Sequence, residues 1–172
     1  MLNKDEIQAY EEPLLDRIEM LEAARLPNER VHFWEKKGLG RVRTGRGNAR
    51  RYSLGETLYY AYLGVLAQAG LPLDAAGSLA AGTFPAVGTS VCHRIGDLLR
   101  ASPEPHKSPR ILAVVCDTEK YGWRQLLVSK QEADEAVAPV PQGSLWAVVI
   151  DLTAIVNITV NGVRGILKAR KD

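Results

Sequence analysis

The sequence contains few of the residues from which disulfide scaffolds, zinc sites and membrane spans are built. Its two cysteines, Cys92 and Cys116, are too few for a disulfide framework or a tetrahedral zinc site, so a reducing compartment is expected. No apolar run approaches the roughly 20 residues of a membrane span. The first residues are acidic where a signal peptide is basic and then apolar. With 46% apolar and 24% charged residues, the composition is typical of a folded cytoplasmic protein with no membrane partner.

Residues suited to catalysis are also scarce. The three histidines, His32, His93 and His106, have no cysteine or further histidine at metal-ligand spacing. No glycine-rich phosphate loop follows an expected strand, and Cys116 ends an apolar segment, where a buried structural thiol is expected. We therefore expect no enzymatic activity, no cofactor and no metal.

Charge is distributed unevenly along the chain, although the net charge is only +2. Residues 1–29 carry −5, residues 30–51 carry +7, and residues 52–172 are neutral. A compact basic block of this kind is the electrostatic footprint of a protein that binds a polyanion. Residues 30–51 are therefore the candidate segment for binding a polyanion.

The first half of the chain contains signals for short helices around this block. Residues 3–12 fit a short acidic helix ended by a proline, and Asp16 can cap a helix over residues 18–24. A second helix is expected over residues 27–37, with Val31 and Trp34 facing inward and Gly38 ending it. Two short helices joined by a tight turn form a helix-turn-helix pattern.

The segment that follows has two arginine-rich runs around a Gly-Arg-Gly-Asn centre, which favours a small β-hairpin, or wing, over residues 41–52. Ser53 and Glu56 form a capping box for a third helix that extends to Gln68, with an apolar repeat every four residues. A fourth helix is expected over residues 73–81. Together these elements predict a winged helix-turn-helix over residues 16–82, preceded by an acidic extension, residues 1–15.

The second half has a different character. A helix over residues 90–100 and a proline-rich linker, residues 101–109, are expected within the connecting segment 83–109. Apolar strands are predicted over residues 110–116, 124–129 and 145–151, and residues 131–136 suit an exposed helix or loop. The last segment, residues 152–167, has a helical apolar stripe but contains Asn161-Gly162, a hairpin-turn signal; we favour the helix.

These patterns predict an α+β protein. The N-terminal winged helix-turn-helix is followed by a small α/β region with about three strands and one or two helices. This C-terminal domain, residues 110–172, would serve dimerisation or ligand binding.

Four segments of the first half resemble the winged helix-turn-helix of the MerR family of bacterial transcription regulators. Glu19–Ala24 is similar to that family's first helix, and Val31–Leu39 to the end of its recognition helix. Arg50–Ser53 resembles the closing strand of its wing, and Leu66–Asp74 the passage from its third helix to its fourth. The four segments occur in the family's order and spacing over residues 16–82. The resemblance implies a regulator that binds double-stranded DNA as a homodimer.

The sequence also departs from the family pattern. His32 stands where the family usually has arginine, Phe33 replaces a tyrosine, Ala49 replaces an aromatic residue of the wing, and Arg25 occupies a turn position often held by glycine. The long dimerisation helix that follows the DNA-binding unit in typical members is not evident from the sequence.

In a winged helix-turn-helix the second helix enters the major groove and the wing contacts the backbone or the minor groove. Arg30 is the first candidate for base contact because arginine pairs with guanine, whereas Asn28 suits adenine and Glu29 can accept from cytosine. Trp34 and Leu58 are expected in the core. The candidate DNA-binding residues are Asn28, Glu29, Arg30, His32, Phe33, Lys36, Lys37, Arg41, Arg43, Arg46, Asn48, Arg50, Arg51 and Tyr52.

Three functions fit the sequence. The first is a sequence-specific transcription regulator, cytoplasmic and associated with the nucleoid through DNA, with a small-molecule or protein effector acting through the C-terminal region. The second is an architectural DNA-binding protein, such as an excisionase-like or phage accessory factor. The third is a protein-interaction or ligand-sensing module that has lost DNA binding.

Overall fold

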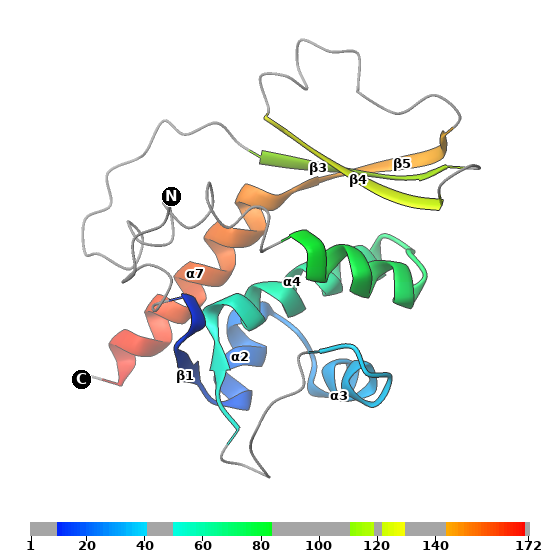
Figure 1. Cartoon of the computed structure of the whole chain (residues 1–172). Helices are drawn as coiled ribbons and strands as arrows, with labels where there is room; N and C mark the ends of the chain where they lie inside the picture. Colours follow the sequence, from blue (N-terminus) through cyan, green and yellow to red (C-terminus); the bar gives the residue numbers. More distant parts are fainter. Residues whose placement is uncertain (1–9, 41–49, 84–110, 119–121, 130–143, 171–172) are drawn as a thin grey trace. The chain divides into compact units, whose positions relative to one another are not determined.

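The structure is a computed structural model that describes residues 10–40, 50–83, 111–118, 122–129 and 144–170 (Figure 1). It is an α+β structure whose chain divides into two units. The first comprises Met1–Pro103 together with Val156–Asp172, and the second comprises Glu104–Ile155.

The two short helices expected from the sequence are present as α2, Arg17–Ala24, and α3, Asn28–Lys36. Asp16 caps α2 as predicted, since its side chain accepts from the Glu19 backbone while the Glu19 carboxylate accepts from the Asp16 backbone. Between the two helices Arg25 has a φ of 55°, in the left-handed region that favours glycine. The tight turn predicted between the helices is therefore present, and arginine adopts its left-handed position.

A small antiparallel sheet joins the segments before and after the helix-turn-helix. Strand β1, Pro13–Leu15, pairs with β2, Tyr52–Ser53, in the register Pro13↔Ser53 and Leu15↔Tyr52. Strand β1 was not predicted from the sequence. Most of the predicted wing and of the predicted helix over residues 3–12 lies outside the described residues.

Helix α4, Leu54–Gln68, carries much of the core of the first unit. It begins with the predicted capping box, in which the Ser53 hydroxyl accepts from the Glu56 backbone and the Glu56 carboxylate accepts from the Ser53 backbone. Ten of its fifteen residues are buried, and Leu58 is fully so. Residues 73–83 form a further helix, which confirms the fourth helix expected from the sequence.

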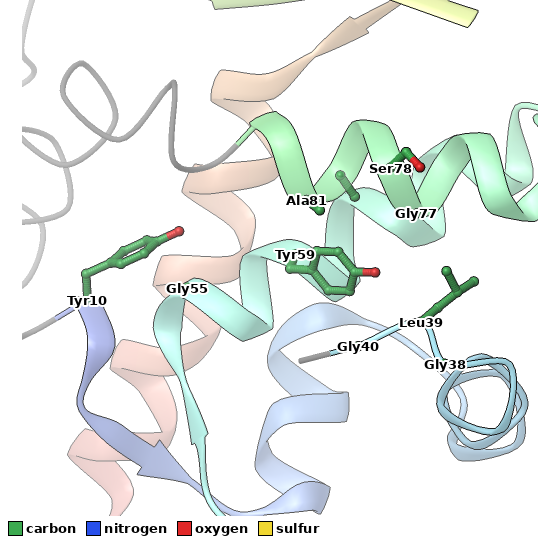
Figure 2. A pocket seen from close by; sticks show the side chains of 10 residues that line it. Tyr10, Gly38, Leu39, Gly40, Gly55, Tyr59, Gly77, Ser78 and Ala81 are labelled. Atoms are coloured by element: carbon green, nitrogen blue, oxygen red, sulfur yellow. The ribbon is translucent and has the colours of Figure 1, made fainter. Parts of the chain in front are cut away.

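A cavity of about 310 Å³ lies beside α4 (Figure 2). The rings of Tyr10 and Tyr59 border it, and its other lining residues are mostly small: Gly38, Leu39, Gly40, Gly55, Gly77, Ser78, Ala80 and Ala81. None of these described lining residues carries a charged side chain.

The second unit contains a three-stranded antiparallel sheet with the order β4-β3-β5. The strands are β3, Ile111–Thr118, β4, Gly122–Ser129, and β5, Ser144–Asp151, each close to a predicted strand. Cys116 pairs with Arg124 on one side and Ala147 on the other, and it is fully buried with a free thiol, as expected. The predicted helix over residues 90–100, the linker 101–109 and the segment 131–136 lie outside the described residues.

The last element is α7, Leu152–Ala169, so the helix is confirmed and the alternative hairpin at Asn161-Gly162 is wrong. The part of α7 that belongs to the first unit packs against α2. A Cβ added at Gly162 would lie 3.0 Å from the Cα of Ala23, and Arg170 after the helix donates to the Glu19 carboxylate and to the carbonyl of Leu14. Within the described parts of the chain, no helix is long and apolar enough to cross a bilayer.

Candidate nucleic-acid interface

Helix α3 has one buried face and one exposed face. Val31 and Trp34 are 0% and 3% exposed and attach the helix to the core, as predicted from their spacing. The opposite face is an exposed stripe at helical spacing, formed by Glu29, His32, Phe33 and Lys36. Helix α3 thus packs on the core through Val31 and Trp34 and presents the opposite stripe outward.

The predicted site residues of α3 lie on or beside this exposed stripe. Asn28 and Lys37 are exposed, and Arg30 is half-buried. Phe33 is 50% exposed, and the Lys37 ammonium lies 5.8 Å from the centroid of its ring. A half-exposed aromatic ring beside a cation offers a DNA duplex both an apolar contact and a positive charge.

Only some of the predicted wing residues lie within the described part of the chain. Arg41, Arg43, Arg46 and Asn48 lie outside the described residues. Of those that follow, Arg51 is exposed, Arg50 is half-buried, and Tyr52 is only 1% exposed.

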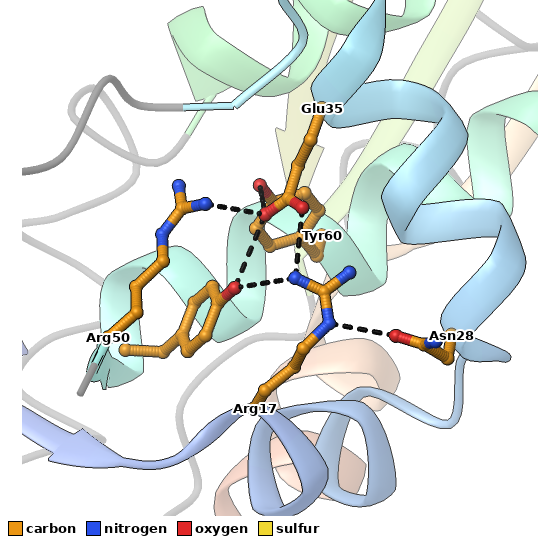
Figure 3. Close-up of polar contacts among 6 residues, drawn as sticks. Arg17, Asn28, Glu35, Arg50 and Tyr60 are labelled. Carbon is orange, nitrogen blue, oxygen red and sulfur yellow. Dashed lines mark hydrogen bonds and ion pairs between the residues drawn. The ribbon is translucent and has the colours of Figure 1, made fainter. Parts of the chain in front are cut away.

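Glu35, near the end of α3, is the centre of a polar cluster that joins four segments of the first unit (Figure 3). The Arg17 Nη1 donates to its Oε2 at 2.9 Å, and Arg50 Nη1 lies 3.2 Å from its Oε1. The hydroxyls of Tyr52 and Tyr60 also donate to Oε1, at 3.2 and 3.4 Å. We call these five residues the Glu35 cluster. It links the start of α2, the end of α3, the segment that returns after residue 49, and α4, which carries Tyr60.

Arg17 also reaches the other end of α3. Its Nε donates to the Oδ1 of Asn28 at 2.8 Å, while its Nη1 additionally donates to the Tyr52 hydroxyl at 3.1 Å. One guanidinium therefore contacts both the first residue of α3 and the carboxylate one residue before its end. This arrangement fixes how α3 lies against α2.

The surroundings of the Glu35 cluster raise the pKa values of Arg17, Tyr52 and Tyr60. Burial alone would lower the pKa of Arg17, but the hydrogen bond and the charge of Glu35 outweigh it and raise that pKa. Burial, followed by the nearby Glu35 charge, raises the pKa values of Tyr52 and Tyr60. At neutral pH Arg17 is therefore charged and both hydroxyls remain protonated donors.

Arg17, Glu35 and Tyr60 were missed as site residues. One sequence signal could have indicated Glu35, because it is the single acid among eight bases in residues 30–51. An isolated carboxylate in such a block is a natural partner for neighbouring arginines. Arg17 and Tyr60 lie 18 and 25 residues away along the chain, and no local pattern connects them to Glu35.

The chain at Gly40 passes close to Tyr60 of the Glu35 cluster. A Cβ at this residue would lie 2.4 Å from the Tyr60 hydroxyl oxygen, and the φ of Gly40 is +142°. Glycine is therefore required here, immediately before the basic segment 41–49.

A metal site is not found among the residues that the structure describes, since they contain no group of three or more His, Cys, Asp or Glu placed to hold an ion. No protein-family model matches the chain, and a search of curated proteins finds no matching relative.

Proposed function

We propose that this protein is a sequence-specific transcription regulator of the MerR-like winged helix-turn-helix type. Helix α3 enters the major groove of double-stranded DNA, and residues 41–52 act as a basic wing against the backbone or the minor groove. The protein acts as a homodimer, because one small helix-turn-helix reads few bases and two-fold pairing doubles the contacts.

The observation that carries this proposal is the exposed face of α3. A helix that buries one face and exposes a stripe on the other is suited to insertion into a groove, and this stripe carries both hydrogen-bonding and cationic side chains. Residues 30–51, which include most of α3 and the segment after it, hold a net charge of +7, and this charge supports attraction to phosphates. The Glu35 cluster supports the proposal further, because it holds the recognition helix against the base of the wing.

The experiment is DNA binding by fluorescence anisotropy at several salt concentrations, after selection of preferred duplexes from a random pool. We expect affinity to fall steeply with salt, because phosphate neutralisation releases counterions. Arg30→Ala should weaken binding to the selected duplex roughly 10-fold, the order expected for losing a base contact.

The matched control is Lys168→Ala, which removes an exposed cation of α7 away from α3. This variant should bind as the unaltered protein does. Binding that is absent in the unaltered protein, or that Arg30→Ala leaves unchanged, contradicts the proposal. Strong bending of any bound duplex without sequence preference would favour an architectural protein instead.

A further inference from the structure

The hydrogen bond between Arg17 and Asn28 fixes the orientation of an exposed amide at the start of α3. Asn28 is the first residue of that helix, and its Oδ1 accepts from the Arg17 Nε at 2.8 Å (Figure 3). A guanidinium can donate hydrogen bonds but cannot accept them. The atom of Asn28 that faces Arg17 must therefore be the oxygen, and its NH2 group is turned away from Arg17.

Arg17 is itself held in place by groups on other segments. Its Nη1 donates to Glu35 at 2.9 Å and to the Tyr52 hydroxyl at 3.1 Å, and its side chain is 31% exposed. Because the guanidinium is planar, these contacts also set the direction of Nε. The orientation of the Asn28 amide is thus determined by residues of α2, α3 and β2 together.

We propose that Asn28 contacts DNA as a hydrogen-bond donor through its NH2 group, and that Arg17 is the positioning residue that imposes this role. Asparagine recognises adenine in the major groove by using its oxygen and its nitrogen at once. With the oxygen directed to Arg17, the outward NH2 group instead matches bases with acceptors there, foremost guanine with O6 and N7. Asn28 therefore favours guanine over the adenine that its residue type alone suggests. This inference rests on the proposed function, since it specifies how α3 reads a base.

Asn28→Asp is the first test, because it replaces the donor with an acceptor of the same shape. The new carboxylate still accepts from Arg17, and a negative charge suits the start of a helix, so the fold is retained. We expect the variant to lose the guanine preference at one position of the selected site and to bind that site about 10-fold more weakly than its control. The control is Gln68→Glu, the same amide-to-carboxylate change at an exposed residue at the end of α4.

Arg17→Met is the second test, because it removes the donor that directs the Asn28 oxygen while keeping a side chain of similar length. The released amide can then use both its oxygen and its nitrogen. We expect site selection with this variant to move from guanine towards adenine at the position that Asn28→Asp affects. A residue that only stabilised the fold would weaken binding without changing the preferred base.

The outcomes separate this inference from the function on which it rests. If neither the unaltered protein nor Gln68→Glu binds DNA, both proposals fail. If both bind, and Asn28→Asp selects the same bases with the affinity of Gln68→Glu, the donor role of Asn28 is wrong while DNA binding stands. If Arg17→Met folds and keeps the guanine preference, the positioning role of Arg17 is wrong. If it fails to fold, Arg17→Lys, which keeps the positive charge but lacks Nε, is used in the same selection with the same expected result.

Discussion

Helices α3 and α4 belong to the same unit, yet they are used in opposite ways. Ten of the fifteen residues of α4 are buried, whereas α3 buries two of nine and exposes the rest to solvent or to polar neighbours. Burial of apolar surface is the main stabilising contribution to folding, so α4 should account for much more of the stability than α3. The difference indicates that α4 contributes mainly to stability, whereas the exposed residues of α3 can change without loss of the fold.

The largest change in stability is expected for a substitution in the core of α4. Leu58→Ala in α4 should lower the free energy of unfolding by about 3 kcal/mol, because Leu58 is 0% exposed and its truncation leaves a cavity. Urea unfolding followed by circular dichroism measures this change. Gln68→Ala, at an exposed residue of the same helix, should stay within about 0.5 kcal/mol of the unaltered protein. A loss below 1 kcal/mol for Leu58→Ala would remove the contrast between the helices.

A smaller effect is expected at Glu35, where α3 takes part in the ion pairs of the Glu35 cluster. Glu35→Gln should lower the free energy of unfolding by about 1–2 kcal/mol, since the hydrogen bonds from Arg17 and Arg50 lose their charged acceptor. The same urea titration measures it, with Lys36→Gln as the control at the adjacent exposed residue. Equal stability of the two variants would mean that the Glu35 cluster orients side chains without stabilising the fold.

The smallest expected effect lies between α2 and α3 and has the opposite sign. Arg25→Gly should raise the free energy of unfolding by about 0.5–1 kcal/mol, because relief of left-handed strain exceeds the added chain entropy of glycine. Thermal unfolding at matched pH and salt measures the gain. Arg25→Ala keeps the strain and should show none, so a similar gain in both variants would attribute the effect to loss of the arginine side chain.

Features encoded by neighbouring residues could be predicted from the sequence, and features made by distant residues could not. The start of α2 follows from the Asp16 cap, the start of α4 follows from the capping box of Ser53 and Glu56, and α3 follows from the spacing of Val31 and Trp34. The strands of the second unit follow from short apolar runs, and their antiparallel order comes from the structure alone.

The candidate site divides in the same way. Residue types and helical spacing identified the exposed residues of α3, because a face of a helix can be read from the sequence. The Glu35 cluster could not be identified, since its contacts join residues 15 to 25 positions apart through tertiary packing. For the same reason the sequence did not show that β1 pairs with β2, or that α7 packs on α2.

The packing of Gly162 on Ala23, together with the hydrogen bonds of Arg170 to Glu19 and Leu14, has a consequence for the order of folding. The second unit is an insertion in the sequence of the first, which is completed only by Val156–Asp172. Forming contacts between residues about 150 positions apart costs a large loop-closure entropy, which opposes folding until the contacts are made. During synthesis, residues 104–155 therefore emerge from the ribosome before Val156–Asp172, and the first unit reaches its final stability only after that last segment has been synthesised.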